Sequence, residues 1–257
     1  MVVVEFVIPL LVLSSILYLV VLRYPAITQR PIASKDKINV LFVTAHPDDE
    51  CMFFTPTFYA LSKQPNVDIT VLCLSTGDHD GAGEVRAKEL VQAASVLGVD
   101  PNKVIIVNSP DLPDNPKKVW NPALVAKTVK AVVVSGKVDA VFTFDVQGVS
   151  GHENHSSAYV GTKHMFLTDQ YFKVNDVRLY TLHSTNLVRK YIGVLDTLFS
   201  LGQAMAAKDS LIFVSGLEGY QMGLRAMSQH SSQMVWFRRL YLAFSRYMFI
   251  NTYSKVH

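Results

Sequence analysis

Histidine and acidic residues of the kind that binds metal ions gather at two places in the sequence. The first place is "AHPDDE", residues 45–50, and the second is "GHENH", residues 151–155. The histidines and aspartates of these two clusters are His46, Asp48, Asp49, His152 and His155. Two histidines and one carboxylate, with an open position for water, form a common catalytic zinc site. The residue types therefore indicate a catalytic metal centre.

Pro47 restricts the backbone of the first cluster. A proline disfavours helical geometry in the residue before it, so His46 is expected to continue the preceding strand. The chain then turns and Asp49 opens a helix, so that His46 and Asp49 converge on one point with Asp48 beside them. Asp48 would then remain free to act as a base. The alternative for Asp48 is a helix N-cap, a position that aspartate favours.

His152 and His155 in the second cluster are three residues apart. In the first turn of a helix they share one face, with Cβ atoms about 5–6 Å apart. One of them could bind the metal while the other faces the substrate. Taken alone, both histidines could also be polar groups on an exposed loop. Because each cluster follows a predicted strand, one shared site is favoured over two unrelated helix caps.

The segments that must position the two clusters alternate between apolar strands and helices. The predicted strands are residues 38–45, 67–75, 103–108 and 138–144, with weaker strands at 178–183 and 211–215. The predicted helices are residues 50–64, 83–99 and 121–135. Strands that are apolar throughout indicate a mostly parallel sheet with helices on both faces, a Rossmann-like α/β fold. Ligands bind at the carboxyl ends of such strands, where both clusters lie.

The motifs "AHPDDE" and "GHENH" together resemble those of the LmbE-like zinc-dependent de-N-acetylases. The segment "GEVRAKELVQAASVLGV", residues 83–99, resembles the G-E-x-R-x-x-E-L helix of that family. An apolar N-terminus and the C-terminal "QHSSQMVWFRRLYLAFSRYMFIN", residues 229–251, resemble its membrane branch, which acts on N-acetylglucosaminyl-phosphatidylinositol. The resemblance covers nearly the whole chain.

The resemblance implies roles for seven residues. The metal ligands would be His46, Asp49 and His155, the general base Asp48, the oxyanion-stabilising residue His152, and the substrate-binding residues Arg86 and His230. The implied cofactor is Zn²⁺, with another divalent metal as the alternative. For Arg86, the other interpretation is a charge on the surface of its helix. His230 and the nearby Gln233 are placed at the site by the resemblance alone.

The activity that the resemblance implies is hydrolysis of the acetamide of N-acetylglucosaminyl-phosphatidylinositol to glucosaminyl-phosphatidylinositol and acetate, the second step of glycosylphosphatidylinositol anchor biosynthesis. The alternatives are a deacetylase of another N-acetyl-sugar conjugate and a non-catalytic membrane scaffold. The net charge of +3 is too small to indicate a nucleic-acid partner. Gly77, Gly81 and Gly83 do not follow the G-x-G-x-x-G order, so no nucleotide cofactor is expected.

The N-terminus predicts a single-pass membrane protein, because residues 6–22 contain no charge and are just long enough to span a bilayer. A cleaved signal peptide and a buried core helix are the alternatives. The basic residues after this run are Arg23, Arg30, Lys35 and Lys37. The positive-inside rule then places the domain in the cytosol, and the implied substrate places it at the endoplasmic reticulum membrane. The expected division is an anchor at 1–22, a linker at 23–37 and a deacetylase domain at 38–257.

Residues 234–250 are expected to form an amphipathic, membrane-associated helix. On a helical plot Arg238, Arg239 and Arg246 fall in one sector. The opposite sector holds the side chains of Trp236, Phe237, Leu240, Tyr241, Phe244, Tyr247 and Met248. Such a helix could lie in the membrane interface, with its arginines near anionic head groups. The alternative is a helix that packs on the domain.

Overall fold

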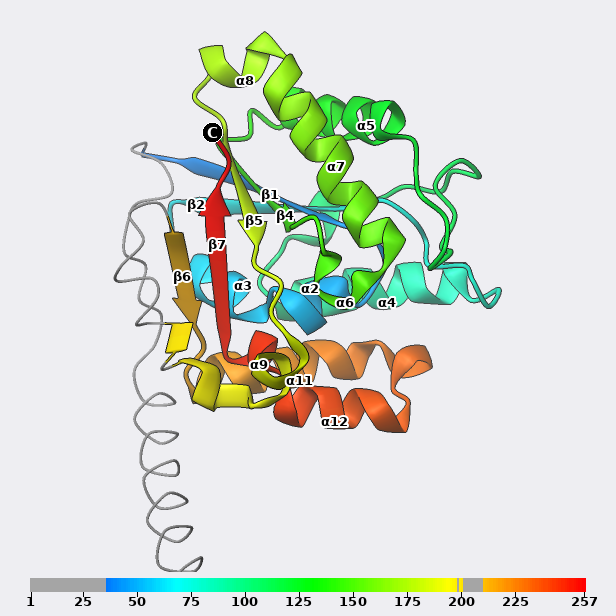
Figure 1. Cartoon of the computed structure of the whole chain (residues 1–257), viewed down its shortest axis with the longest axis vertical. Helices are drawn as coiled ribbons and strands as arrows, with labels where there is room; N and C mark the ends of the chain where they lie inside the picture. Colours follow the sequence, from blue (N-terminus) through cyan, green and yellow to red (C-terminus); the bar gives the residue numbers. More distant parts are fainter. Residues whose placement is uncertain (1–35, 198, 201–209) are drawn as a thin grey trace, which may run out of the picture.

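The computed structural model describes residues 36–197, 199–200 and 210–257, which form a seven-stranded sheet flanked by helices (Figure 1). The strands are β1 (Ile38–Thr44), β2 (Val67–Cys73), β3 (Val104–Ile106), β4 (Ala140–Phe144), β5 (Arg178–Leu182), β6 (Ser210–Val214) and β7 (Ile250–Lys255). Their order across the sheet is β3-β2-β1-β4-β5-β7-β6. β1 to β5 are parallel, and β7 lies antiparallel between β5 and β6. The mostly parallel α/β sheet is confirmed.

Apolar side chains explain why the parallel strands lie in the centre of the sheet. In β1, the side chains from Val40 to Val43 are fully buried or nearly so, and β4 is buried along its whole length. Such strands need cover on both faces, which a parallel sheet receives from its crossover helices. The two weaker predictions, now β5 and β6, are also strands. The antiparallel β7 was not predicted.

Helices and short 3₁₀ turns connect the strands. The α-helices are α2 (Asp49–Phe53), α3 (Thr55–Ser62), α4 (Gly83–Val96), α5 (Pro122–Ser135), α6 (Gly148–Gly151), α7 (Glu153–Thr168), α8 (Gln170–Val174), α9 (Leu187–Tyr191), α11 (Leu217–Gln229) and α12 (Trp236–Phe244). The 3₁₀ turns are η1 (Pro101–Lys103), η2 (Gly193–Leu195), η3 (Ser231–Gln233) and η4 (Arg246–Met248). Contacts pair α5 with α7, and α11 with α3 and α4, as layers beside the sheet.

The predicted helix 50–64 is two helices, α2 and α3, which meet at Phe54. Pro56 lies in the first turn of α3, where a missing backbone N–H costs nothing. The hydroxyl of Thr55 donates a hydrogen bond of 2.7 Å to the carbonyl of Cys51. The short α2 therefore ends early and points its first turn, with Asp49, into the carboxyl edge of the sheet.

The C-terminal segment differs from the single helix expected over 234–250. After α12 ends, Ser245 takes an extended backbone, η4 follows, and β7 begins at Ile250. Arg246, expected near anionic head groups, is fully buried, with its Nε 2.6 Å from a carboxylate oxygen of Asp196. A helical plot shows where charged side chains lie around a helix, but it does not show which groups they contact. The ion pair between Arg246 and a buried carboxylate could therefore not be predicted from it.

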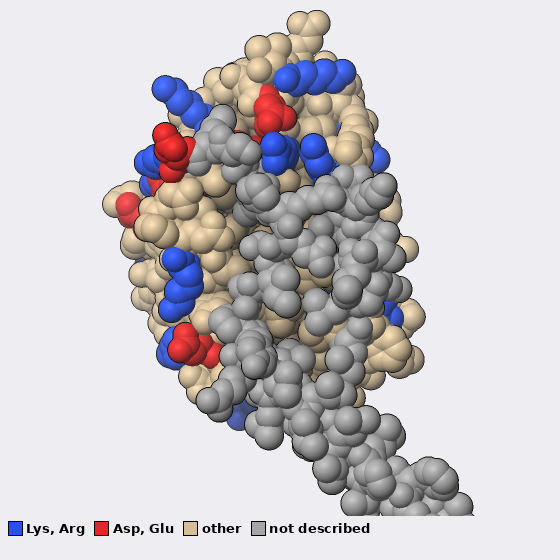
Figure 2. Space-filling view, turned by 90° about the vertical axis from the view of Figure 1, so that its left-hand side faces the viewer, with Lys and Arg blue, Asp and Glu red and all other residues tan. Residues whose placement is uncertain are grey.

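The expected anchor at 1–22 and nearly all of the linker lie outside the described residues. Within residues 36–197, 199–200 and 210–257, no helix is long and apolar enough to cross a membrane. On the described surface visible in Figure 2, Lys and Arg lie among Asp and Glu rather than in a field of one sign. This mixed surface agrees with the small net charge.

Candidate active site

A cavity of about 520 Å³ opens at the carboxyl ends of β1 and β4, where the two predicted clusters meet. Six of the seven predicted site residues line it: His46, Asp48, Asp49, Arg86, His152 and His155. The first three follow β1, and the two last belong to the start of α7, beyond β4. Side chains about one hundred positions apart therefore share one site, as the strand order predicts.

The carboxylate of Asp49 is oriented by the backbone that precedes it. Its Oδ2 accepts hydrogen bonds from the N–H groups of Ala45 (2.9 Å) and His46 (2.8 Å). Its Oδ1 lies 3.1 Å from Nε2 of His155. Burial disfavours the charged form of Asp49, but the facing His155 and His46 outweigh this effect and lower its pKa. Asp49 therefore presents an ionised oxygen to both rings.

His155 has a ring orientation suited to metal binding through Nε2. Its Nδ1 lies 2.9 Å from the carbonyl oxygen of Gly148, which can only accept, so Nδ1 carries the proton. Nε2 then faces Oδ1 of Asp49 at 3.1 Å and Nδ1 of His46 at 3.3 Å. Phe144 stacks on the ring with centroids 4.2 Å apart, which fixes its plane. A hydrogen bond of this kind from the other ring nitrogen is usual for a ligating histidine.

His46 is oriented in the same manner from its other nitrogen. Its Nε2 lies 3.2 Å from a carboxylate oxygen of Asp114 and 3.1 Å from Oδ1 of Asn154, so Nε2 is the donor and Nδ1 faces His155. Burial lowers the pKa of His46, but the hydrogen bond to Asp114 and the charges of Asp49 and Asp114 raise it overall. The buried lone pairs of His46, His155 and Asp49 thus converge, and this donor set fits a zinc-type cation.

His152 is placed close to the other two histidines but is oriented differently. A ligand atom of each of His46, His152 and His155 lies within 4.8 Å of the others, so three histidines could in principle hold an ion. However, Nδ1 of His152 accepts the backbone N–H of Asn154 (3.2 Å) as the N-cap of α7. The neutral ring then carries its proton on Nε2, which makes that nitrogen a hydrogen-bond donor and not a ligand. Burial, followed by the charges of His46 and His155, lowers the pKa of His152 to about 4.

Asp48 faces the cavity from a strained turn. Its φ of 108° lies in the left-handed region, which a non-glycine residue rarely adopts. Its side chain makes no capping hydrogen bond to α2, so the alternative role as a helix cap is not realised. Instead, the carboxylate forms ion pairs with Arg238 and with Arg86, the latter at 3.4 Å. Strain of this kind gathers at functional sites.

Arg86 is buried, so the interpretation as a surface charge is wrong. Its guanidinium donates to the carbonyls of Gly77 (2.6 Å) and Pro47 (2.8 Å) and to Asp114 (3.1 Å). Gly77 has a φ of +72°, and a Cβ there would lie 2.5 Å from the guanidinium. Arg86 therefore ties together three loops around the cavity, and it also lines the cavity wall.

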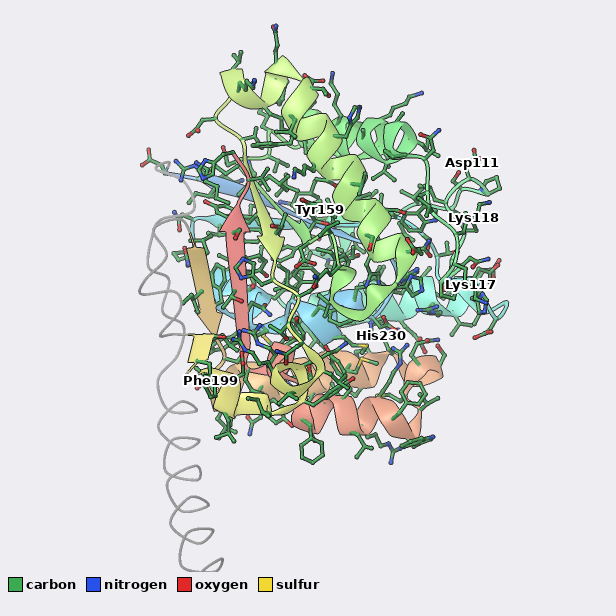
Figure 3. All side chains as sticks on the ribbon, in the orientation of Figure 1. Asp111, Lys117, Lys118, Tyr159, Phe199 and His230 are labelled. Atoms are coloured by element: carbon green, nitrogen blue, oxygen red, sulfur yellow. The ribbon has the colours of Figure 1, made fainter. Side chains whose placement is uncertain are left out.

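His230 is not at the cavity, and the expectation that it binds substrate is corrected. Its ring is fully buried, with Nε2 2.6 Å from a carboxylate oxygen of Glu50, in the interior above α12 (Figure 3). Glu50, Cys51 and His230 form a second group of potential metal ligands within 4.8 Å. The Glu50 carboxylate already accepts from His230, from the thiol of Cys51 and from the N–H of Asp48. The neighbouring Gln233 does line the cavity.

Several cavity residues were missed from the sequence. They are His79, Asp80, Asp114, Lys190, Tyr191, Phe237 and Arg238. Asp114 lies in a proline-rich loop, where no periodic pattern marks one carboxylate as functional. Arg238 was assigned to a head-group-facing sector, although its guanidinium turns inward to Asp48.

Known proteins are similar to this chain in sequence and in fold. The family model described as PIG-L, GlcNAc-PI de-N-acetylase, matches residues 41–166. N-acetylglucosaminyl-phosphatidylinositol de-N-acetylase of Bos taurus is 42% identical over 83% of this chain and 82% of its own length. A probable enzyme of the same name from Schizosaccharomyces pombe is 41% identical, over 84% of this chain and 86% of its own.

Solved structures agree with this chain in fold. N,N'-diacetylchitobiose deacetylase from Pyrococcus horikoshii superposes with a TM-score of 0.58 at 17% identity, covering 86% of this chain and 84% of that one. The teicoplanin deacetylase Orf2 gives a TM-score of 0.57 at 12% identity, covering 84% and 97%. At such identities the likeness concerns the architecture, an α/β sheet like that of the LmbE-type deacetylases.

Proposed function

Because this chain belongs to the GlcNAc-PI de-N-acetylase family, we propose that it is a metal-dependent enzyme that hydrolyses the acetamide of N-acetylglucosaminyl-phosphatidylinositol. The products are glucosaminyl-phosphatidylinositol and acetate, and the reaction is the second step of glycosylphosphatidylinositol anchor synthesis. One observation carries the proposal: Nδ1 of His46, Nε2 of His155 and the carboxylate of Asp49 face one another at distances of 3.3, 3.1 and 3.9 Å, and Asp48 stands beside them.

The ligands that this chain offers are His46 through Nδ1, His155 through Nε2 and Asp49 through Oδ1. Zn²⁺ is the cation that two imidazoles and one carboxylate suit best, and other divalent metals are the alternatives. When bound, such a cation supplies Lewis acidity, which lowers the pKa of a water molecule and polarises the amide carbonyl. Asp114 and Gly148 hold the two histidines in the required tautomers.

The protein's own groups account for the proton transfers. Asp48 accepts a proton from the attacking water at its carboxylate. As the carbonyl carbon becomes tetrahedral, the Nε2–H of His152 donates a hydrogen bond to the oxygen that gains negative charge. One such donor is worth about 3–4 kcal/mol in comparable sites. The C–N bond then breaks, the leaving sugar amine takes the proton from Asp48, and acetate is released.

The lowered pKa of His152 has a direct consequence for this role. At neutral pH the ring is neutral, so it donates through Nε2 without carrying a charge of its own. A neutral imidazole can donate a hydrogen bond to the oxyanion without repelling a metal cation bound beside it. Residues that line the cavity around it, including Lys190 and Arg238, supply the positive charge that a phosphodiester head group requires.

We further propose that the enzyme is a single-pass protein of the endoplasmic reticulum membrane, with its catalytic domain in the cytosol. The uncharged run 6–22 and the four basic residues that follow it support this orientation. The diacylglycerol part of the substrate supports the membrane location, since its acyl chains stay in a bilayer.

The test is deacetylation by the purified full-length chain, with acetate release measured on N-acetylglucosaminyl-phosphatidylinositol and on free N-acetylglucosamine. We expect release from the glycolipid, loss of release after chelation, and recovery on adding Zn²⁺. Release from the free sugar at an equal rate would support the alternative, a deacetylase of other N-acetyl-sugar conjugates. No release from either substrate by the metal-loaded protein would favour a scaffold.

A further inference from the structure

The helix α12 turns its apolar side away from the domain. Tyr241 and Leu242 pack inward, whereas Trp236, Leu240 and Phe244, four residues apart along one face, are half exposed or more. Trp236 keeps 73% of its surface accessible. Figure 3 shows side chains on the lower side of α12 projecting away from the rest of the molecule. A helix that only packed on the domain would turn this face inward.

A second helix with exposed apolar side chains lies against α12. Leu187 and Val188 of α9 are each 72% exposed. The two helices touch through the rings of Tyr191 and Tyr241, whose centroids are 6.3 Å apart, and they lie together at one end of the molecule (Figure 1). We call the exposed side chains of these helices the outer apolar face, which consists of Leu187, Val188, Trp236, Phe237, Leu240 and Phe244.

A buried ion cluster holds α9 in place. Asp196 is fully buried and pairs with Arg189 of α9 (2.6 Å) and with Arg246 of η4 (2.6 Å). η4 follows directly after α12, so one carboxylate ties both helices to the domain. Breaking such a pair leaves a buried charge without a partner, which is strongly unfavourable. The outer apolar face is therefore presented by a fixed platform.

The same two helices form part of the cavity wall. Lys190 and Tyr191 from α9, and Arg238 and Tyr241 from α12, line the cavity, and Phe237 belongs both to the cavity lining and to the outer apolar face. Their inner sides thus meet the proposed substrate head group, while their outer sides carry apolar side chains. A surface that covered the outer apolar face would border the cavity mouth.

We propose that the outer apolar face rests on a phospholipid bilayer and so places the cavity at the depth of the head groups. The inference rests on the proposed function, because a phosphatidylinositol head group reaches only a short way from the membrane. Withdrawing its acyl chains would cost about 0.8 kcal/mol for each buried CH₂, so the cavity must come to the bilayer.

Charge and residue type favour lipid over a protein partner. Neither α9 nor α12 contains an acidic residue, and Arg239 is exposed between the apolar side chains of α12. Tryptophan and phenylalanine beside exposed basic groups are typical of interfacial segments on anionic membranes. Arg238 and Arg246, by contrast, face inward, so the membrane contact is made chiefly by the apolar face and not by the arginine sector.

Fluorescence of Trp236 provides the first test, since the chain has only two tryptophans and Trp120 is buried. The full-length chain is placed in nanodiscs of phosphatidylcholine and phosphatidylinositol, with or without bromine atoms on the upper acyl chain. We expect bromine to quench the wild type and to leave the Trp236→Phe variant, which reports on Trp120 alone, almost unchanged. Equal quenching of both proteins would overturn the proposal, and a protein partner would then be the occupant to seek.

Activity provides the second test, with the double variant Trp236→Glu/Leu240→Glu and the control Val174→Glu, which changes an exposed valine on the distant α8 (Figure 1). We expect the rate of the double variant on substrate embedded in nanodiscs to fall about tenfold, which corresponds to the loss of one apolar anchor. Its rate on a water-soluble short-chain analogue should be unchanged. The control should lose neither. An equal loss on both substrates, or none on either, would contradict the proposal. If the wild type cleaves neither substrate, the proposed function fails, while the quenching experiment still decides the membrane contact.

Discussion

Arg238, on the last helix of the chain, forms an ion pair with Asp48 in the turn after the first strand. The two residues are 190 positions apart. The guanidinium of Arg238 also lies 3.5 Å from the side-chain oxygen of Gln233 and 3.5 Å from the sulfur of Met52. The helix α12 therefore closes the cavity over the proposed base and fixes the direction of its carboxylate.

Arg238→Ala should lower kcat because it frees the Asp48 carboxylate from one of its two ion-pair partners. A hydrogen bond to a charged group contributes about 1.5–3 kcal/mol, so we expect a loss of roughly tenfold to a hundredfold. Bound metal should be unchanged. Arg225→Ala removes an exposed arginine from α11 and is the matched control. A full rate in Arg238→Ala would remove Arg238 from the machinery of the site.

Metal content will distinguish the two possible ligand sets. His46→Ala, Asp49→Ala and His155→Ala should each lose the bound divalent ion after dialysis, as measured by elemental analysis. His152→Ala should keep it, because Nδ1 of His152 caps α7 and its Nε2 is a donor. Loss of metal from His152→Ala together with retention in Asp49→Ala would instead support the three-histidine site.

Asp48→Asn should keep the metal and lose most turnover. An amide has nearly the size of the carboxylate but cannot accept a proton from water at neutral pH. General-base catalysis typically contributes about 10²–10⁴-fold, which sets the expected loss in kcat. Asp111→Asn, which changes an exposed carboxylate that does not line the cavity, is the control and should retain its rate. Equal rates in the two variants would assign the base elsewhere.

His230 should act on stability, and its effect should depend on pH. Burial lowers the pKa of His230, but the charge and hydrogen bond of Glu50 outweigh this and raise it above 6.5, with Asp48 and Glu89 adding to the effect. The folded state then holds this proton more tightly than the unfolded state, so the stabilisation is full below pH 6.5 and declines as pH rises through the folded pKa.

His230→Gln leaves the buried Glu50 without its charged partner. We expect it to lower the free energy of unfolding by about 3 kcal/mol at acidic pH, with a smaller difference from wild type at alkaline pH. Urea unfolding in detergent at several pH values measures this. Bound metal should persist, since His230 does not reach the cavity. If the difference in free energy of unfolding between wild type and His230→Gln grew with pH, a protonated His230 would not be what stabilises its pair with Glu50.

The parallel core of the fold could be predicted because its signals are local. Apolar strands flanked by helices are evident from pattern alone, and the predicted helix 121–135 is present as α5, which Pro122 opens after an Asn121 cap. The motif residues from His46 to Asp49 were predicted correctly at the carboxyl edge, because the end of a strand fixes the position of the next few residues. The clustering of His152 and His155 with them is expected once β1 and β4 are neighbours.

The C-terminal third was harder to predict because long-range contacts decide it. β7 pairs with β5 and β6, and these contacts override the helical pattern that leads into Ile250. Arg238 and Arg246 share a sector of the helical plot with Arg239, yet two turn inward to carboxylates and one stays exposed. No property of these arginines themselves distinguishes the three.

Asp114 is the site residue whose contribution to metal binding is best tested by substitution. Its carboxylate lies 3.2 Å from Nε2 of His46 and 3.1 Å from a guanidinium nitrogen of Arg86, and both contacts keep its pKa low, at about 2, despite burial. Asp114→Ala should weaken metal binding by roughly tenfold to a hundredfold, as losing the outer partner of a ligating histidine does. Asp114→Asn keeps an acceptor and should lose less.

Asp111→Asn is the matched control for Asp114, because it changes an exposed aspartate in the same loop (Figure 3). Metal affinity measured by competition with a fluorescent chelator gives the comparison directly. If Asp114→Ala and Asp111→Asn bind metal equally well, then Asn154, the other oxygen near Nε2 of His46, is sufficient to hold the ring. If Asp114 orients His46, metal binding should be weakest in Asp114→Ala, stronger in Asp114→Asn and strongest in the Asp111→Asn control.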